Sequence, residues 1–456
     1  MTSRPCYRET EADAPHDPLL TVANLAAAHR GETHFVYERG ETWTFCAGAL
    51  AELTVDAHHV HYVCGSERRS VAWRDQPLRT VAELLGTLPT RSWRAYGWAA
   101  FELAARFAHP AGEVLPAART PHDTRGPLLK LVVPRDEIRI TAGRALLNCV
   151  DEARSAELTA LLGALPMRSE PARGTVESDL AVTGGQYRER VSEAVAEIAA
   201  GLLDKVVLSR VVPVPHEIDL IDSFVLGRRH NTPARSFLLH MGGLRAAGFS
   251  PEVVLSVCAD GRVRTQPLAG TRALTPSAVE NRRLRAELLG DAKEIHEHEI
   301  SVTAALEEMR TVCEAAGVGV DEYMAVKERG SVQHLASQVS GRLAPGRDRW
   351  DAFAALFPAI TASGVPKSAA MEAIRRHEQE ARGMYGGAVL TLGSDGSLDA
   401  GLVLRAVFAQ AGRVWLRAGA GVVRDSVPAR ELEETCEKLR SVAAYLVPAR
   451  ALAEVP

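Results

Sequence analysis

RAGAGVVRDSVPARELEETCEKLRS, residues 417–441, is the stretch around which the rest of the chain is organised. It sets a glycine-rich turn, Gly419 to Gly421, before a helix that carries Glu431, Glu434 and Lys438. Residues at positions i, i+3 and i+7 lie on one face of a helix. Two carboxylates and one ammonium group are therefore expected to point the same way, close to exposed backbone amides. Such a face could hold a metal ion and an anionic substrate together.

The composition predicts an ordinary soluble globular protein. The 456 residues are 46% hydrophobic and 24% charged, enough for a large core in one big domain or in two to three smaller ones. A formal net charge of −4 gives no basic surface for nucleic acid. Residues 1–20 lack the apolar core of a signal peptide, and no apolar run approaches the roughly 18–20 residues of a membrane span. We expect a cytoplasmic protein with no nucleic-acid or membrane partner.

The cysteines point to the same compartment. Seven is an odd number, and the chain contains no C-x-x-C pair. This pattern argues against a disulfide framework, and neither the cysteines nor the histidines have the spacing of a zinc site. We expect reduced thiols.

The first third of the chain carries no recognisable chemistry of its own. Residues 1–165 alternate short apolar runs with helical stretches, and residues 166–178 read equally well as a linker or as a surface loop. We divide the chain into an N-terminal α+β part, residues 1–178, and a catalytic part, residues 179–456.

The catalytic part mixes strands and helices in no regular order. A β-rich run starts at Lys205, hairpins are expected over 253–265 and 388–408, and a long helix is expected over 283–313. This order favours an α+β fold with antiparallel sheets over a doubly wound parallel sheet.

A second acidic cluster matches the one on the opening stretch. On a helix, Glu294, Glu297 and His298 share a face. A solvated acidic face is the simpler interpretation of this spacing alone. Two helices that each offer a glutamate pair, however, suit a hard, oxygen-preferring cation such as Mg²⁺. Glu431 and Glu434 supply the second pair.

Several other residues have both a structural and a chemical interpretation. Lys205 is either an exposed edge lysine or a general base with a lowered pKa. Glu252 precedes an apolar strand, and burial would raise its pKa so that it could donate a proton. The small-residue loop Pro267–Arg272 is either a turn or a site where amides meet a carboxylate. Arg405 and Lys438 could bind an anionic substrate, although Lys438 could equally form a surface ion pair within its helix.

Ten blocks in order carry a resemblance to a known family: KVVLSR (205–210), SPE (250–252), PLAGTR (267–272), KEIHEH (293–298), SVQHLAS (331–337), LFPAITASGVPK (356–367), RGMYGGAV (382–389), LRAVF (404–408), AGAGVV (418–423) and ELEETCEKL (431–439). From about Tyr187 to Val447 the chain resembles the chorismate-utilising enzymes, which include anthranilate, aminodeoxychorismate, isochorismate and salicylate synthases. The resemblance implies the single large fold of anthranilate synthase component I, with antiparallel sheets sandwiched between helices and the site in a cleft.

Within the family the chain most resembles the salicylate synthase branch. Lys205 stands where water-using members have lysine and ammonia-using members have a non-basic residue, and Thr361 lies in a stretch similar to that of salicylate synthases. Gln266 departs from this branch, where an acidic residue precedes PLAGT. Three alternatives stay open: an isochorismate synthase that releases isochorismate, an ammonia-using synthase of the anthranilate or aminodeoxyisochorismate type, and a non-catalytic relative.

The resemblance also implies roles for particular residues, with chorismate as substrate and Mg²⁺ as cofactor. The implied Mg²⁺ ligands are Glu294, Glu297, Glu431 and Glu434. The implied substrate-binding residues are Gly270, Thr271, Thr361, Tyr385, Arg405, Gly419, Ala420, Gly421 and Lys438. The implied catalytic residues are Lys205 as the base that activates water, Glu252 as the acid that protonates the leaving hydroxyl, and His334 near the reacting ether.

The activity implied is a two-step conversion of chorismate. Water attack at C2 with loss of the C4 hydroxyl gives isochorismate, and pericyclic elimination then gives salicylate and pyruvate. Such salicylate would feed a siderophore or another aromatic natural product. No glutaminase subunit is expected, and a monomer is compatible with the sequence.

Overall fold

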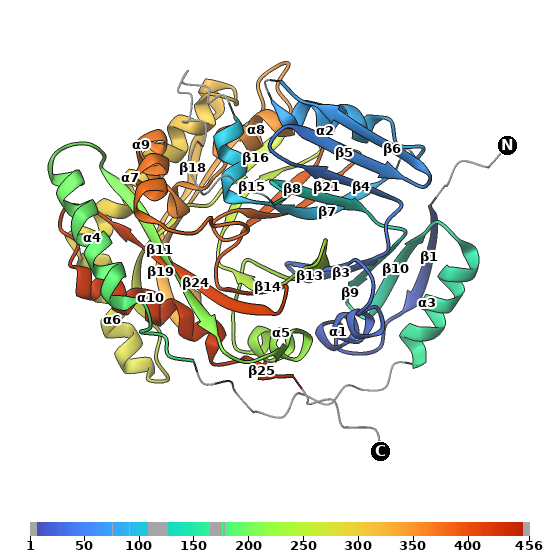
Figure 1. Cartoon of the computed structure of the whole chain (residues 1–456), viewed down its shortest axis with the longest axis horizontal. Coiled ribbons are helices and arrows are strands. Elements are labelled where there is room, and N and C mark those ends of the chain that lie inside the picture. The colour runs from blue at the N-terminus through green and yellow to red at the C-terminus, as the bar shows by residue number, and fades with distance from the viewer. Residues whose placement is uncertain are drawn as a thin grey trace.

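The computed structural model describes residues 7–74, 76–90, 92–107, 126–164, 176 and 178–449. Two large sheets lie one above the other in Figure 1, with helices on their outer sides. The strand pairs in this part of the chain are antiparallel. This arrangement confirms the predicted α+β class with antiparallel sheets.

The lower sheet in Figure 1 has 11 strands. Their spatial order is β1 (Arg8–Asp13), β10 (Arg144–Cys149), β9 (Asp136–Thr141), β3 (Thr42–Ala47), β2 (His34–Arg39), β13 (Arg235–Met241), β14 (Leu244–Ser250), β23 (Ala406–Gln410), β24 (Arg413–Val422), β11 (Lys205–Val214) and β20 (Gly364–Val365).

The upper sheet has 12 described strands. Eleven lie side by side in the order in which they are named below, and the strand named last pairs only with β19. They are β17 (Leu268–Ala273), β19 (Val332–Arg342), β16 (Arg262–Thr265), β15 (Val253–Val257), β22 (Leu398–Leu402), β21 (Ala388–Gly393), β7 (Arg94–Ala99), β8 (Leu129–Val133), β4 (Ala51–Val55), β5 (His59–Cys64), β6 (Glu67–Ala72) and β18 (Gly319–Arg329). A separate short pair joins β12 (Ile218–Asp219) to β25 (Val447–Pro448).

The helices cover the outer faces and one end of the two sheets (Figure 1). The α-helices are α1 (Pro18–Ala28), α2 (Pro77–Gly86), α3 (Glu152–Ala164), α4 (Gly184–Ala199), α5 (Leu220–Arg229), α6 (Ala278–Gly290), α7 (Ala292–Arg310), α8 (Arg349–Leu356), α9 (Lys367–His377) and α10 (Pro428–Ala443). Short 3₁₀ turns are η1 (Phe101–Arg106), η2 (Ala315–Gly317) and η3 (Ile360–Ala362). None of the helices described is long and apolar enough to cross a membrane.

Alternating side chains explain how the layers pack. In β2, Phe35 and Tyr37 enter the core between the two sheets, whereas Val36 enters the core under α1, α3, α5 and α10. The period of two residues sends successive side chains to opposite faces of a sheet. Both faces of β2 are therefore apolar and buried, because each sheet is sandwiched between its partner sheet and a layer of helices.

Strands from both sides of residue 178 belong to both large sheets. In the lower sheet β2 pairs with β13, and in the upper sheet β7 pairs with β21. The N-terminal part thus contributes strands to the framework that carries the catalytic part. Most of the predicted linker, residues 166–175 and 177, lies outside the described residues, as does Cys6. The cysteines that the structure describes are free thiols.

The single long helix predicted over 283–313 is wrong. The structure has α6 and α7 there, separated at Asp291. The carboxylate of Asp291 accepts hydrogen bonds from the backbone N–H groups of Lys293 and Glu294, which caps the start of α7. The break therefore follows from a capping residue inside a helix-forming sequence, and it fixes the orientation of the first turn of α7.

Three further local predictions are wrong, each at a point where the backbone meets the site. The stretch 402–408 is not one strand, because Arg405 has a φ of +50° and the chain there passes from β22 in one sheet to β23 in the other. Residues 268–273 form strand β17 with a bulge at Gly270 instead of a loop. Gly419 to Gly421 lie inside strand β24 instead of a turn.

A fully buried charge cluster fastens α9 to the lower sheet. Glu378, which is 4% exposed, accepts hydrogen bonds from Arg382 and Arg417 and from the N–H and hydroxyl of Ser209 on β11. Burial alone would raise the pKa of this carboxyl, but the two guanidinium groups hold it at about 2. Glu378 is therefore ionised, and its loss would leave two buried cations unpaired.

We predict that Glu378→Ala lowers the free energy of unfolding by roughly 3–5 kcal/mol, the usual cost of breaking a buried ion pair. Urea unfolding followed by tryptophan fluorescence measures this. The matched control is Glu380→Ala, because Glu380 pairs with Arg413 on the surface with both side chains about half exposed. That change should cost no more than about 1 kcal/mol. Equal losses in the two variants would contradict the prediction.

Candidate active site

Most of the predicted site residues surround one cavity. The cavity and the open solvent at its mouth together take up about 750 Å³. Those in its wall are Glu252, Gly270, Thr271, Glu297, His334, Thr361, Tyr385, Arg405, Gly419, Gly421, Glu434 and Lys438. Four predicted residues lie behind the wall, namely Lys205, Glu294, Ala420 and Glu431.

Glu252 enters the cavity as a buried acid. It directly precedes β15 and is 3% exposed. Burial raises its pKa to about 8, against the opposing effects of a Thr361 hydrogen bond and the charge of Lys205. The Thr361 hydroxyl donates to Oε1 of Glu252 at 2.6 Å. Near neutral pH, Glu252 therefore holds a proton that it can give to a group in the cavity.

Arg405 and His334 form the cationic end of the cavity. An Arg405 N–H donates to Nε2 of His334, so this nitrogen must be the acceptor. Nδ1 of His334 then carries the hydrogen and lies 3.0 Å from the Thr271 hydroxyl oxygen and 3.3 Å from the Gly270 carbonyl oxygen. Burial and the neighbouring charge of Arg405 hold the pKa of His334 well below its usual range. His334 is therefore neutral, and both ring nitrogens are occupied by protein groups.

The charge of Arg405 has no carboxylate partner in the described part of the chain. Arg405 is 7% exposed, and its other hydrogen bond goes to the carbonyl oxygen of Arg329 at 2.6 Å. Burial, with a smaller contribution from the Arg329 charge, lowers its pKa to about 9. A buried guanidinium without an anion is costly. Arg405 thus favours a ligand that brings a negative charge.

Lys205 lies at the start of β11 and is 1% exposed, so the interpretation as an exposed edge lysine is wrong. Its Nζ is 3.0 Å from Oε1 of Glu297 and 3.0 Å from the hydroxyl oxygen of Ser301, both on α7. Lys205 therefore contacts Glu297, a residue of the cavity wall, from the side that faces away from the cavity.

The two predicted glutamate pairs come together from α7 and α10. We call Glu294, Glu297, Glu431 and Glu434 the acidic cradle; each is at most 7% exposed. Lysine ammonium groups lie among these carboxylates: Lys205 at Glu297, Lys438 at Glu434, and Lys293 at three of them. In this arrangement no three acidic, histidine or cysteine side chains within the described residues converge on a point as metal ligands would.

The chemistry of the cradle nevertheless fits a hard cation. Oε2 of Glu431 is buried and has no hydrogen-bond partner. Burial and the nearby charge of Glu434 raise the pKa of Glu431 to about 7, while Lys293 opposes them. At Gly421 a Cβ atom would lie 2.2 Å from Oε1 of Glu297, so only glycine lets the strand approach this carboxylate. The cradle offers oxygen ligands only, as a hard cation prefers.

Gly419 and Tyr385 shape the wall beside Arg405 and Lys438. A Cβ at Gly419 would meet the Tyr385 hydroxyl oxygen at 3.0 Å, and Nζ of Lys438 donates to the Gly419 carbonyl oxygen at 3.0 Å. Lys438 also forms the ion pair with Glu434, at 2.6 Å, that its helical spacing allowed. By contrast, the amide of Ala420 donates to the Tyr187 hydroxyl, so this N–H group already has a partner within the protein.

Sequence reasoning missed Lys293, Ser301, Arg329 and Arg417. Lys293 and Ser301 follow the same helical face as Glu294 and Glu297, so their spacing could have indicated them. Arg417 is a wall residue that also bonds Glu378. Arg329 lies far from Arg405 in the sequence, and no pattern pointed to their contact.

Comparison with known proteins gives the family. The sequence model of the chorismate binding enzymes matches residues 32–444. The chain is 41% identical over 434 residues to the salicylate synthase of Mycolicibacterium paratuberculosis, covering 95% of this chain and 94% of that protein. It is 43% identical over 263 residues to anthranilate synthase component 1 of Streptomyces coelicolor, covering 57% of this chain and 51% of that protein. The chain belongs to the chorismate-binding enzymes, which confirms the resemblance.

Solved structures agree with this fold. Anthranilate synthase component I from Streptococcus pneumoniae superposes with a TM-score of 0.74 at 25% identity, covering 89% of this chain and 92% of that one. The menaquinone-specific isochorismate synthase from Escherichia coli superposes with a TM-score of 0.72 at 22% identity, covering 97% and 95%. The predicted large fold with sandwiched antiparallel sheets is therefore confirmed.

We predict that the carboxyl of Glu252 titrates near pH 8. The infrared C=O band of its protonated form, isolated by subtracting the spectrum of Glu252→Gln, should disappear with that midpoint. Thr361→Val should move the midpoint upward, because the Thr361 hydrogen bond favours the ionised form. A midpoint near the ordinary glutamate value of about 4.3 would contradict the prediction.

Proposed function

We propose that this chorismate-binding enzyme is a Mg²⁺-dependent salicylate synthase, which converts chorismate to isochorismate and then to salicylate and pyruvate. One observation carries the proposal: a buried, protonated Glu252 and a buried, unpaired Arg405 belong to the wall of the same cavity. An anionic substrate that must lose a hydroxyl group needs both. Similarity to a salicylate synthase along 95% of the chain supports the product.

The cationic end of the cavity would hold a carboxylate of chorismate. Arg405 supplies the charge, and neutral His334 holds its guanidinium by accepting one of its N–H groups. Tyr385 and the backbone at Gly419 and Gly421 form the adjacent wall. In this proposal His334 acts by positioning Arg405, since neither ring nitrogen is free to move a proton.

The first step needs one base and one acid. Water attacks C2 and gives its proton to Nζ of Lys205, the two conjugated ring double bonds shift to C1=C6 and C4=C5, and the C4–oxygen bond breaks. Glu252 protonates the departing hydroxyl, which leaves as water. Lys205 is paired with Glu297 in this structure, so it can serve as a base only after that pair opens and the ammonium loses its proton.

The acidic cradle would hold Mg²⁺ through Glu297 and Glu434, with Glu294 and Glu431 beside them. When bound, the ion supplies positive charge that fixes the ring carboxylate and offsets the four glutamates. Glu294 is held for this role by the Thr271 amide, which donates to its Oε2 at 2.8 Å.

The second step requires no further acid or base. Loss of pyruvate from isochorismate can proceed by a concerted transfer of the C2 hydrogen to the enolpyruvyl group, which gives salicylate. Catalysis then consists of holding a reactive conformation in a fixed electrostatic environment. One cavity can therefore serve both steps. We further propose a cytoplasmic enzyme that works without a glutaminase subunit and supplies salicylate for siderophore or aromatic natural-product synthesis.

We predict that purified protein, chorismate and Mg²⁺ yield salicylate and equimolar pyruvate, separated by chromatography and assayed independently. EDTA should stop the reaction, and ammonium should change neither product nor rate. Isochorismate without pyruvate would instead identify an isochorismate synthase. Turnover only with ammonia would identify an aminating synthase and refute the role of Lys205.

We predict that Glu252→Gln lowers turnover of chorismate by roughly 10²–10⁴-fold, the usual contribution of a general acid. Turnover of supplied isochorismate to salicylate should persist, because that step uses no acid. In the wild type, conversion of chorismate should fall as pH rises through about 8, since Glu252 donates only while protonated. Glu433→Gln, on the exposed face of α10, is the control and should change neither step. Equal loss of both steps in Glu252→Gln would contradict the assignment.

A further inference from the structure

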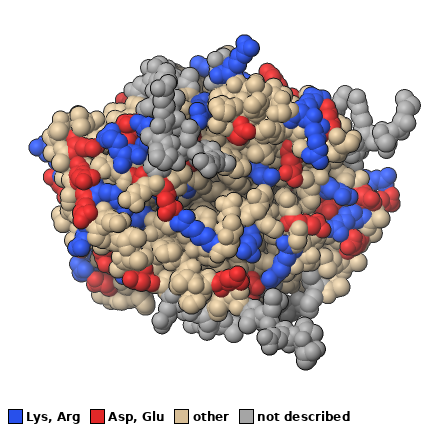
Figure 2. Space-filling view, viewed as in Figure 1, with Lys and Arg blue, Asp and Glu red and all other residues tan. Residues whose placement is uncertain are grey.

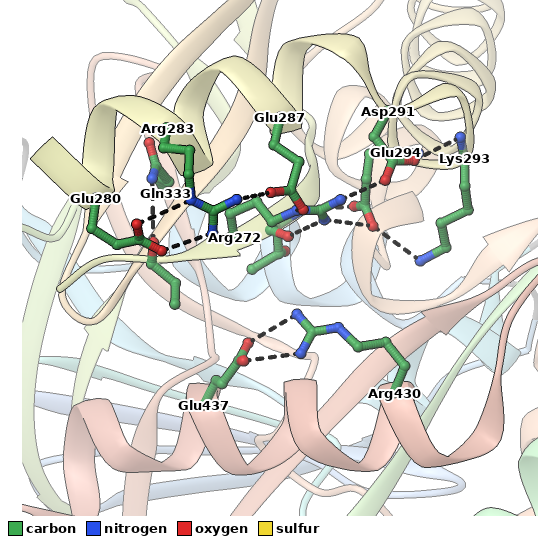
Figure 3. A network of polar contacts seen from close by, with 12 residues as sticks. Arg272, Glu280, Arg283, Glu287, Asp291, Lys293, Glu294, Gln333, Arg430 and Glu437 are labelled. Carbon is green, nitrogen blue, oxygen red and sulfur yellow. Dashed lines mark hydrogen bonds and ion pairs between the residues drawn. The ribbon is translucent and has the colours of Figure 1, made fainter.

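Lys293 occupies the middle of the acidic cradle. It lies in the first turn of α7, and its Nζ is 3.4 Å from Oε1 of Glu294, 3.7 Å from Oε2 of Glu297 and 3.4 Å from Oε1 of Glu431. Figure 3 shows Lys293 and Arg272 on either side of Glu294, with α10 below. One ammonium group thus contacts carboxylates from two helices, among them Glu297, which the proposed Mg²⁺ site would use.

Charge explains why an ammonium group is found there. The ammonium group of Lys293 lies within 3.7 Å of carboxylate oxygens of Glu294, Glu297 and Glu431. Lys293 therefore acts as a counter-ion to the cradle. Figure 2 shows positive and negative side chains intermixed on the face in view. The four glutamates of the cradle are buried instead.

The backbone around Lys293 is held while its side chain keeps a route to solvent. Asp291 caps α7 by accepting from the Lys293 N–H, and Arg272 bonds both Asp291 and Glu294. The Lys293 side chain is 21% exposed, whereas that of Lys205 is 1% exposed. Partial exposure and a place on the first turn of a helix distinguish Lys293 from Lys205, which is enclosed between β11 and α7.

We propose that Lys293 is a displaceable counter-ion, whose ammonium group fills the acidic cradle in the metal-free enzyme and turns out to solvent when a divalent cation binds. This rests on the proposed function only in taking the cradle as the Mg²⁺ site. Two cations cannot share the position, because like charges a few ångströms apart repel strongly in a buried site. A divalent ion replaces one positive charge by two and so satisfies the glutamates better.

Competition between the Lys293 ammonium group and a bound ion would also favour divalent over monovalent cations. A tethered ammonium group is always present at high effective concentration. A monovalent ion would bring no more charge than the lysine it displaces, whereas Mg²⁺ would bring twice as much. Lys293 therefore lowers the affinity of the cradle for every cation and excludes monovalent ions.

Removing the ammonium group tests the proposal without any substrate. Metal-free wild type, Lys293→Met and Lys293→Arg are titrated with MgCl₂ by calorimetry, and their melting temperatures are measured in EDTA and in Mg²⁺. We expect Lys293→Met to bind Mg²⁺ at least about 10-fold more tightly than the wild type. It should melt lower in EDTA, because the glutamates lose their counter-ion, and show a larger rise on adding Mg²⁺.

Two variants serve as controls. Lys293→Arg keeps the positive charge and should bind Mg²⁺ as weakly as the wild type. Lys130→Met removes a lysine that is paired with Glu52 in the upper sheet, and it should leave Mg²⁺ affinity unchanged. If Lys293→Met folds only when Mg²⁺ is present, that result also supports the proposal.

Unchanged or weaker Mg²⁺ binding by Lys293→Met would overturn the proposal. Unchanged binding would mean that the ammonium group does not compete, and weaker binding would mean that it helps to hold the ligands. Neither readout uses chorismate. A failed product assay would therefore refute the proposed function and leave the Mg²⁺ titration valid, and the reverse also holds.

Discussion

The four buried glutamates on α7 and α10 need positive charges nearby to stay ionised, and basic side chains from several elements of the site supply them. Lys205 approaches from β11, Lys438 from α10 itself, Lys293 from the first turn of α7 and Arg272 from β17. Buried carboxylates without such partners would take up protons or destabilise the fold. Burial and the charge of Glu434 nevertheless raise the pKa of Glu431, and its Oε2 has no hydrogen-bond partner.

The opposite end of the cavity carries positive charge. Arg405 lies close enough to Arg329 for their charges to interact, neither has a carboxylate partner in the described part of the chain, and His334, which accepts from Arg405, is neutral. Under the proposed function, one carboxylate of chorismate would lie at Arg405 and the other at a cation held by the glutamates. The cavity would in this way select a dianion.

The sequence predicted the fold class and most of the cavity wall, but it predicted local backbone geometry poorly near the site. The helical spacing of Glu431, Glu434 and Lys438 was right because a helix fixes which side chains share a face. The turn expected at Gly419 to Gly421 was wrong, since these glycines serve close approach within a strand. The contact between Arg405 and Arg329 depends on how segments distant in the sequence pack together. Local sequence patterns carry no information about such packing.

Glu297 connects the parts of the site that the proposed chemistry would use in turn. One of its oxygens lies 3.0 Å from Lys205 and the other 3.7 Å from Lys293. Any cation that draws on this carboxylate weakens its hold on both lysines at once. Lys205, which would activate water, and Lys293, which fills the cradle, thus both pair with Glu297.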